Sequence, residues 1–262
     1  MGKMKWKDRN WLFQKYVVER KSTIIVAREA GCDHKTIWLW IRKFDFKIRG
    51  HSEAVSNALT NHLNLSRPLR EFLKGEMLGD GHLRENSRWS ATYECASKYF
   101  LYSQWLSETL KSFGAYQAGK ILKRKHEQKS PYKTSITYRY RTRSYAEFHM
   151  LWENWYRKGR AEEKYKFVKI IPQNLELSPL ACRQWFIGDG HLHKKKGITL
   201  STQGFAVSEV YFLMKLLNNL QFATSYKSAV NSIYIPKRDA KCFLNFIGSC
   251  PIENIYGYKW AV

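Results

Sequence analysis

Two stretches of this chain combine a helical spacing of apolar residues with the same polar ending. The first covers residues 73–83 and the second residues 182–192, and each stops at Gly-Asp-Gly-His-Leu. Asp80 and Asp189 therefore lie at the C-terminal ends of two predicted helices, where the helix macrodipole is negative. A carboxylate is unfavourable there unless a positive group, such as a metal cation, lies against it. Two such helix ends brought together would form a metal site with two carboxylates.

The residues that follow each motif predict the same order of elements. After Asp80 the pattern predicts strands at 90–95, 118–124 and 135–143 and helices at 97–113 and 145–155. After Asp189 it predicts strands at 198–202, 223–228 and 232–235 and helices at 207–220 and 238–247. Each half closes on a Tyr-Lys-aromatic triplet, at residues 165–167 and 258–260. Because the two aspartates lie 109 residues apart, the chain contains a duplicated unit rather than a short-period repeat.

The predicted strand at 135–143 alternates two kinds of side chain. One face carries Ile136, Tyr138 and Tyr140, and the opposite face carries Thr137, Arg139, Arg141 and Arg143. The first face can pack on helices, while the second presents a row of guanidinium groups to a partner.

The N-terminal residues predict three short helices. Ser22 is a favourable N-cap for the second helix, Gly31 can end it in a left-handed turn, and Asp33 caps the third. Residues 22–44 resemble a bacterial or phage-type helix-turn-helix, whose third helix would present four side chains to a DNA major groove: His34, Lys35, Trp38 and Arg42. The alternative is a three-helix packing module that does not contact DNA. We expect this domain at residues 1–46, followed at 47–66 by a polar, mostly extended linker with one short helical turn.

The charge of the chain indicates a polyanionic partner. Its 262 residues include 45 Lys plus Arg against 22 Asp plus Glu, a formal net charge of +23. Such an excess favours nucleic acid first and an anionic membrane surface second, but the basic residues lie on predicted strands rather than on one amphipathic helix. The five scattered cysteines form no CxxC pair, and no apolar run is long enough to span a bilayer. We therefore expect a protein of a reducing, intracellular compartment: the cytoplasm or nucleoid, with an organelle as an alternative.

These features together resemble the LAGLIDADG homing endonucleases in their single-chain, two-motif form. The resemblance covers residues 69–262 and rests on the repeated motif, the strand order, the closing triplets and the basic excess. It implies an α+β fold of two pseudo-symmetric αββαββα halves, at 67–172 and 173–262, whose curved sheets form a saddle over the DNA major groove. Gln184 replaces a small residue that helps the motif helices approach each other, whereas Gly75 and Gly79 keep that spacing in the first copy. How closely the helices pack is therefore open.

The same resemblance implies hydrolysis of both DNA strands with Mg²⁺ bound by Asp80 and Asp189, assisted by the carbonyls of Gly79 and Gly188. Hard oxygen ligands suit Mg²⁺, which can neutralise developing phosphate charge and activate water. Two or three ions are expected, with Mn²⁺ accepted and Ca²⁺ bound without cleavage.

The resemblance also implies a polar set of residues around the metals. Gln203 matches the water-positioning glutamine, with Glu94 as its nearest counterpart in the first half. Lys166 and Lys259 match the basic residue through their Tyr-Lys-aromatic triplets.

DNA contacts are expected from the strand faces and from one lysine-rich loop. Arg139, Arg141 and Arg143 are the leading candidates for base recognition, because arginine binds guanine edges with two hydrogen bonds. Further candidates for contacts to bases or phosphates are Lys120, Arg124, Lys194, Lys195, Tyr234 and Lys237.

The sequence therefore predicts a monomeric, Mg²⁺-dependent endonuclease that cuts double-stranded DNA at a long specific target, encoded by a mobile intron or a free-standing mobile gene. Two alternatives remain open. One is a non-catalytic DNA-binding regulator, and the other is a maturase that binds intron RNA.

Overall fold

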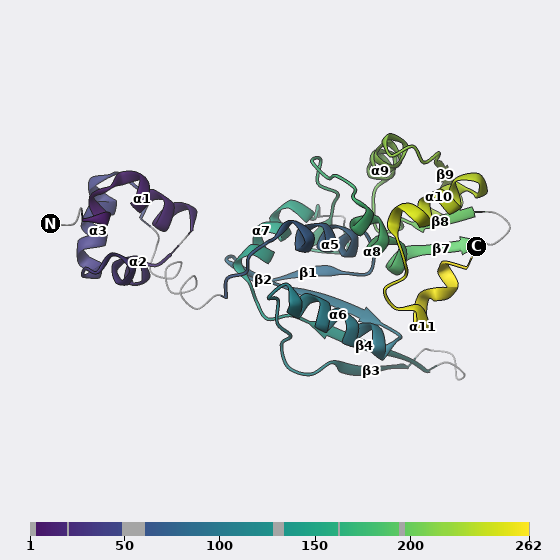
Figure 1. Cartoon of the computed structure of the whole chain (residues 1–262), viewed down its shortest axis with the longest axis horizontal. Coiled ribbons are helices and arrows are strands. Elements are labelled where there is room, and N and C mark those ends of the chain that lie inside the picture. The colour runs from purple at the N-terminus through teal and green to yellow at the C-terminus, as the bar shows by residue number, and fades with distance from the viewer. Residues whose placement is uncertain are drawn as a thin grey trace. The chain divides into compact units, whose positions relative to one another are not determined.

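A computed structural model describes residues 4–19, 21–48, 61–127, 134–161, 163–193 and 197–261. The chain divides into two compact units, Met1–Asn61 and His62–Val262 (Figure 1). Most of the predicted linker, at residues 49–60, lies outside the described residues, including its predicted helical turn. Residues 62–66 belong to the second unit, because Leu63 is buried there and its backbone N–H donates to the carboxylate of Glu147 at 2.9 Å.

The first unit is all-α, and local capping explains where its helices begin and end. Its helical segments are η1 (Lys5–Lys7), α1 (Arg9–Phe13), a π-helical turn (Gln14–Val18), α2 (Thr23–Ala30) and α3 (His34–Lys43). The Ser22 hydroxyl accepts a hydrogen bond from the backbone of Ile25, and the Asp33 carboxylate accepts one from the backbone of Lys35. Gly31 ends α2 with a φ of 71°, as a left-handed cap requires. The helices enclose a small core: Leu12, Tyr16, Val26, Ala27, Ile37, Ile41 and Phe46.

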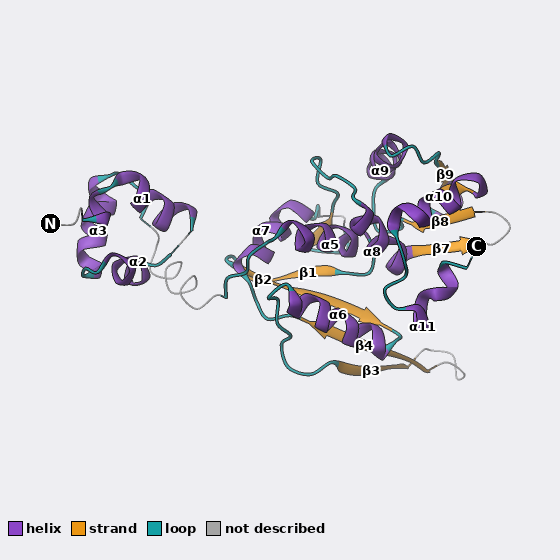
Figure 2. Ribbon diagram, viewed as in Figure 1, coloured by secondary structure: helices purple, strands orange, loops and turns teal. Residues whose placement is uncertain are grey.

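The second unit contains the same set of elements twice (Figure 2). The first set is α5 (Arg67–Leu78), β1 (His82–Ser87), β2 (Ser90–Ser97), α6 (Phe100–Ser112), β3 (Leu122–Glu127), β4 (Thr134–Arg141) and α7 (Ala146–Trp155). A two-stranded ribbon follows, β5 (Tyr156–Lys158) and β6 (Phe167–Lys169). The second set is α8 (Pro179–Asp189), β7 (Gly190–His193), β8 (Gly197–Ser201), α9 (Val207–Asn219), β9 (Ser225–Lys227), β10 (Ser232–Pro236), α10 (Lys237–Ile247), α11 (Glu253–Tyr256) and η4 (Gly257–Lys259). The sheets have equivalent antiparallel orders, β1-β2-β4-β3 and β7-β8-β10-β9.

The strands that directly follow each motif, β1 and β7, were not predicted from the apolar pattern. β1 is polar along most of its length, and pairing with β2 rather than an apolar face places it in the sheet. The ribbon of β5 and β6 was missed for a similar reason, since each strand has only three residues. Short or polar strands depend on partners that are distant in sequence.

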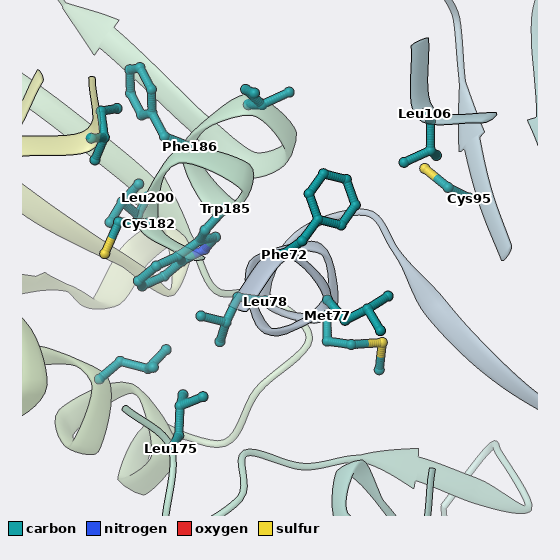
Figure 3. Packing of buried hydrophobic residues seen from close by; sticks show 14 of the residues in the cluster. Phe72, Met77, Leu78, Cys95, Leu106, Leu175, Cys182, Trp185, Phe186 and Leu200 are labelled. Carbon is teal, nitrogen blue, oxygen red and sulfur yellow. The ribbon is translucent and has the colours of Figure 1, made fainter. Parts of the chain in front are cut away.

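The motif helices α5 and α8 pack side by side between the two sheets (Figure 1). A Cβ on Gly75 would lie 2.2 Å from the carbonyl oxygen of Ala181 and 2.6 Å from Cβ of Gln184, so only glycine fits. Ala181 provides the small surface in α8, and Gln184 itself is buried with 1% of its surface exposed. The substitution of Gln184 therefore does not separate the helices. Figure 3 shows the buried side chains of this region, with Leu78 of α5 and Trp185 of α8 among them.

Candidate active site

The two motif aspartates meet where α5 and α8 end. Asp189 is the last residue of α8, and Asp80 follows the C-cap of α5, Gly79. A Cβ on Gly188 would lie 3.1 Å from the backbone nitrogen of Asp80 and 3.7 Å from its Oδ2 atom. The glycines before the aspartates thus allow the two helix ends to come together and bring both carboxylates to one place.

The electrostatics of this pair favour a cation. Burial raises the pKa of Asp80, and burial together with the charge of Asp80 raises the pKa of Asp189 to about 6. The charges of Lys169 and Lys259 oppose both shifts, and the described residues contain no cluster of three or more His, Cys, Asp or Glu side chains that could hold a metal. Two adjacent carboxylates supply hard oxygen ligands of the kind that can hold a divalent cation.

Two lysines cap the same helix ends. Lys169 Nζ donates to the carbonyls of Met77 and Gly81, both at 2.8 Å, and lies 3.5 Å from that of Gly79. Lys259 Nζ donates to the carbonyls of Phe186 at 3.2 Å and Ile187 at 2.7 Å. Burial lowers the pKa of both lysines to about 8, although the nearby Asp80 and Asp189 oppose the shift. Each half therefore places one carboxylate and one ammonium at the site.

The structure corrects the expected position of the first lysine. Lys166 is exposed, with its ammonium 5.3 Å from the ring centroid of Phe167, and Lys169 takes the place expected for it. Side chains in a strand alternate between faces, so Phe167 and Lys169 in β6 share one face and Lys166 is on the other side. In the second half the triplet lies in the helical turn η4 rather than a strand, and Lys259 does reach the site.

The residues expected to position water are also distributed differently. Gln203 is exposed and lies two residues after the end of β8. The sheet register pairs His82 with Glu94 and His191 with Thr199, so the counterpart of Gln203 in the first half is Lys98 rather than Glu94. Lys98 is exposed, and its charge contributes to lowering the pKa of Lys259. Sequence alignment could not locate Lys98, because the loops of the two halves differ in length.

Glu94 instead forms the centre of a charged cluster. It is 0% exposed and bonds to the guanidinium of Arg139, with Arg84 Nε 3.2 Å and His82 Nε2 3.4 Å away. Burial alone would raise the pKa of Glu94, but hydrogen bonds from His82 and Arg139 and the charge of Arg84 outweigh it and lower the pKa to about 2. The cluster fixes these basic side chains on the polar face of the first sheet.

A second buried carboxylate was also missed by sequence reasoning. Tyr93 and Tyr102 donate hydrogen bonds to Glu76 of α5 at 2.5 and 3.0 Å. Burial raises the pKa of Glu76 to about 7. The only signal in the sequence is a glutamate within a motif helix that is otherwise largely apolar, and Trp185 occupies the same motif position in the second copy.

The first sheet brings together most of the arginines expected to contact DNA. The register pairs Arg141 with Glu94 and Arg124 with Thr137, which places Arg124, Arg139 and Arg141 on the polar face. Arg143 lies beyond β4, with its guanidinium 5.7 Å from the ring centroid of Tyr116. Lys120 does not join this face, because it lines a hollow with residues of α6.

The remaining described DNA-contact candidates belong to β10, to the start of α10 and to the first unit. Tyr234 of β10 has the ammonium of Lys227 4.8 Å from its ring centroid, and Lys237 is exposed at the start of α10. Lys194 and Lys195 lie outside the described residues. In α3 all four candidates are exposed (His34, Lys35, Trp38 and Arg42), and the Arg42 guanidinium lies 4.7 Å from the Trp38 ring centroid. None of the helices in the described ranges is long and apolar enough to cross a membrane.

The fold is a duplicated α+β unit, and each half places one carboxylate and one lysine where the two motif helices end. The sequence model of the LAGLIDADG DNA endonuclease family matches residues 70–243, and the chain belongs to this family. The predicted family and fold class are thereby confirmed.

Two similar proteins carry different names. An uncharacterized protein of Methanocaldococcus jannaschii is 29% identical over 222 residues, 82% of this chain and 81% of that protein. The cytochrome b mRNA maturase bI2 of Saccharomyces cerevisiae is 27% identical over 163 residues, 59% of this chain but only 37% of the maturase. The fold is similar to that of the homing endonuclease I-WcaI bound to its DNA recognition sequence, with a TM-score of 0.58 and 21% identity over 83% of this chain and 96% of that one.

Proposed function

We propose that this protein makes site-specific double-strand breaks in DNA at a long target sequence. The observation that carries the proposal is the meeting of Asp80 and Asp189 at two helix ends, with Lys169 and Lys259 capping the same ends. The two strands of a duplex are related by local two-fold axes. A pseudo-symmetric protein with one carboxylate and one lysine per half can therefore act on each strand with one half.

Asp80 and Asp189 would hold two or three divalent ions together with the DNA, with Mg²⁺ as the physiological ion. The carbonyls of Gly79 and Gly188 are further candidate ligands, although Gly79 also lies near the Lys169 ammonium. Bound Mg²⁺ would neutralise charge that develops on the scissile phosphate and lower the pKa of an attacking water. We expect Mn²⁺ to replace it and Ca²⁺ to bind without supporting cleavage.

The lysines contribute charge and proton transfer. Because the pKa of Lys169 and Lys259 is lowered to about 8, each can hold or release a proton close to neutral pH, which suits a group that acts on a leaving oxygen or a water. Gln203 and Lys98 lie after equivalent strands and would orient water at the edge of the site. Protein side chains thus surround the scissile phosphates with positive and hydrogen-bonding groups.

DNA would bind across the polar faces of the two sheets. Arg124, Arg139 and Arg141 form the basic part of the first face, and Tyr234 belongs to the second. The net charge of +23 supplies a large non-specific contribution to binding through phosphate contacts. The exposed α3 residues of the first unit would add further contacts to DNA.

The proposal can be tested by cleavage with matched variants. Genomic DNA fragments that the protein binds in Ca²⁺ would be selected and sequenced to find the target. That target would be cloned into a plasmid and incubated with the protein and Mg²⁺. Asp80→Asn and Asp189→Asn should each abolish cleavage, because each removes a metal ligand, while affinity measured with Ca²⁺ stays close to wild type. If wild type binds its target tightly and leaves it uncut in Mg²⁺, the protein is a DNA-binding regulator instead.

A second candidate function is maturation of intron RNA, because one relative is named an mRNA maturase. The chain spans only 37% of that protein. Competition between labelled intron RNA and target duplex distinguishes the two candidate functions. RNA that binds specifically and is not displaced by DNA would support a maturase role.

The biological setting belongs to the same proposal. We infer a monomer, because one chain already contains both motif helices and both aspartates. We also infer an origin in a mobile intron or a free-standing mobile gene, and action inside the cell where target DNA is found. Sedimentation of the DNA complex tests the first inference, and sequencing of the flanking genes tests the second.

A further inference from the structure

The backbone next to Lys169 is held by the opposite half of the molecule. Two residues after Lys169, the N–H of Ile171 donates to Glu209 Oε1 at 2.7 Å, and Glu209 belongs to the first turn of α9 in the second half. The Lys169 ammonium also lies 5.9 Å from the ring centroid of Phe205, which precedes α9. The first turn of α9 therefore contacts the segment that delivers Lys169 to the active site.

The segment around Lys259 has an equivalent contact with the first half. The ring of Tyr256 packs edge-on against Tyr99 and Tyr102, with centroid distances of 5.7 and 5.6 Å. Tyr102 is the third residue of α6, and Glu209 is the third residue of α9. Each contact therefore joins the start of a helix in one half to the segment that carries the lysine of the other half, but one is a hydrogen bond to a carboxylate and the other an aromatic cluster.

We infer that Glu209 is a positioning residue for Lys169 and that it thereby controls the cleavage of one DNA strand and not the other. The inference rests on the proposed double-strand cleavage. Glu209 does not reach the reacting atoms in this arrangement, since it acts through the backbone of Ile171.

The physical reason is that Lys169 must approach its carbonyl partners in a defined position. The backbone after it has two anchors: the N–H of Ile170 donates to the carbonyl of Trp155 at 2.8 Å, and the N–H of Ile171 donates to Glu209. Ile171 is buried, so loss of the carboxylate would leave its N–H without an acceptor and favour a shift of the segment. Small displacements of a positioned group cost large factors in rate.

Glu209 also caps α9, and an experiment must separate this role from its contact with Ile171. Its Oε2 atom accepts a hydrogen bond from the backbone of Ala206 at 2.8 Å, which caps α9. Glu209→Ala removes both bonds. Adding Ala206→Ser provides a hydroxyl N-cap for the helix without restoring an acceptor for Ile171.

The cleavage test follows both strands of an end-labelled target. In Glu209→Ala, and equally in Glu209→Ala with Ala206→Ser, one strand should be cut roughly tenfold more slowly, which corresponds to about 1.4 kcal/mol, and nicked DNA should accumulate. The other strand should stay within about twofold. Tyr256→Leu should show the mirrored pattern, with the other strand slowed. Equal slowing of both strands, or recovery of the rate by Ala206→Ser, would overturn the inference.

A second readout does not depend on cleavage. Acetylation of the metal-free protein, mapped by mass spectrometry, should modify Lys169 several-fold faster in both Glu209 variants, while Lys259 reacts as in wild type. Unchanged Lys169 reactivity would refute the positioning role. If wild type cuts no DNA, the proposed function fails, and the acetylation pattern alone still decides whether Glu209 positions Lys169.

Discussion

Replacing Lys259 by methionine should stabilise the protein while it removes cleavage activity. Lys259 is only 5% exposed, and burial lowers its pKa from the ordinary 10.5 to about 8, which corresponds to a cost of roughly 3 kcal/mol for keeping the ammonium charged. Methionine has a similar length and no charge. It loses the hydrogen bonds to the carbonyls of Phe186 and Ile187, about 1 kcal/mol each. The net gain is therefore about 1 kcal/mol near pH 7.

The stabilisation by Lys259→Met should depend on pH. Folded Lys259 loses its proton near pH 8 and unfolded Lys259 near 10.5, so the unfolded chain binds more protons between these values and wild-type stability rises with pH there. The advantage of Lys259→Met should be largest below pH 8 and should shrink as the pH rises above 8. Thermal unfolding at pH 6.5, 7.5 and 9.5 measures it, with an expected increase in Tm of about 2–4 °C at the lower values.

Lys166→Met is the matched control, because Lys166 is the central residue of the corresponding triplet of the first half and is exposed. It should leave both Tm and the cleavage rate unchanged. The reasoning is refuted if Lys259→Met lowers Tm at pH 7, or if its effect on Tm does not vary with pH.

Three further predictions concern the helix pair, the charged cluster and DNA binding. Gly75→Ala should destabilise the second unit by several kcal/mol, because the new Cβ would meet the carbonyl of Ala181 at 2.2 Å. Gly204→Ala is the control, because Gly204 has open space around it, and it should change the free energy of unfolding, measured with urea, by less than about 0.5 kcal/mol. Glu94→Gln should lower the free energy of unfolding by about 1–3 kcal/mol at pH 6 and by little at pH 2. The lowered pKa of Glu94 contributes stability that is lost as the pH falls from about 4.5 toward 2. Urea midpoints of wild type and variant at the two pH values test this prediction. DNA affinity should fall by about 10³-fold between roughly 50 and 200 mM salt, and a salt-independent affinity in a filter-binding titration would contradict binding through many phosphates.

Local signals explain which features could be predicted. The caps at Ser22, Gly31 and Asp33 depend on residues within one helical turn, and the structure has all three. The central helices and strands of each half could be predicted from the spacing of apolar residues, which is also a local signal. The polar strand β1 and the short β7, β5 and β6 carry no such pattern, because their places depend on pairing with distant strands.

The sequence by itself determined the duplication, the two aspartates at helix ends and the basic character of the chain, because each is a matter of residue type and spacing. Only the tertiary structure decided that Lys169 rather than Lys166 caps α5, since the strand pairing of β6 sets which face reaches the site. It likewise decided that Glu94 binds arginines and that Gln184 fits against Gly75. Such contacts join residues that are far apart along the chain, and the packing of the two halves brings them within bonding distance.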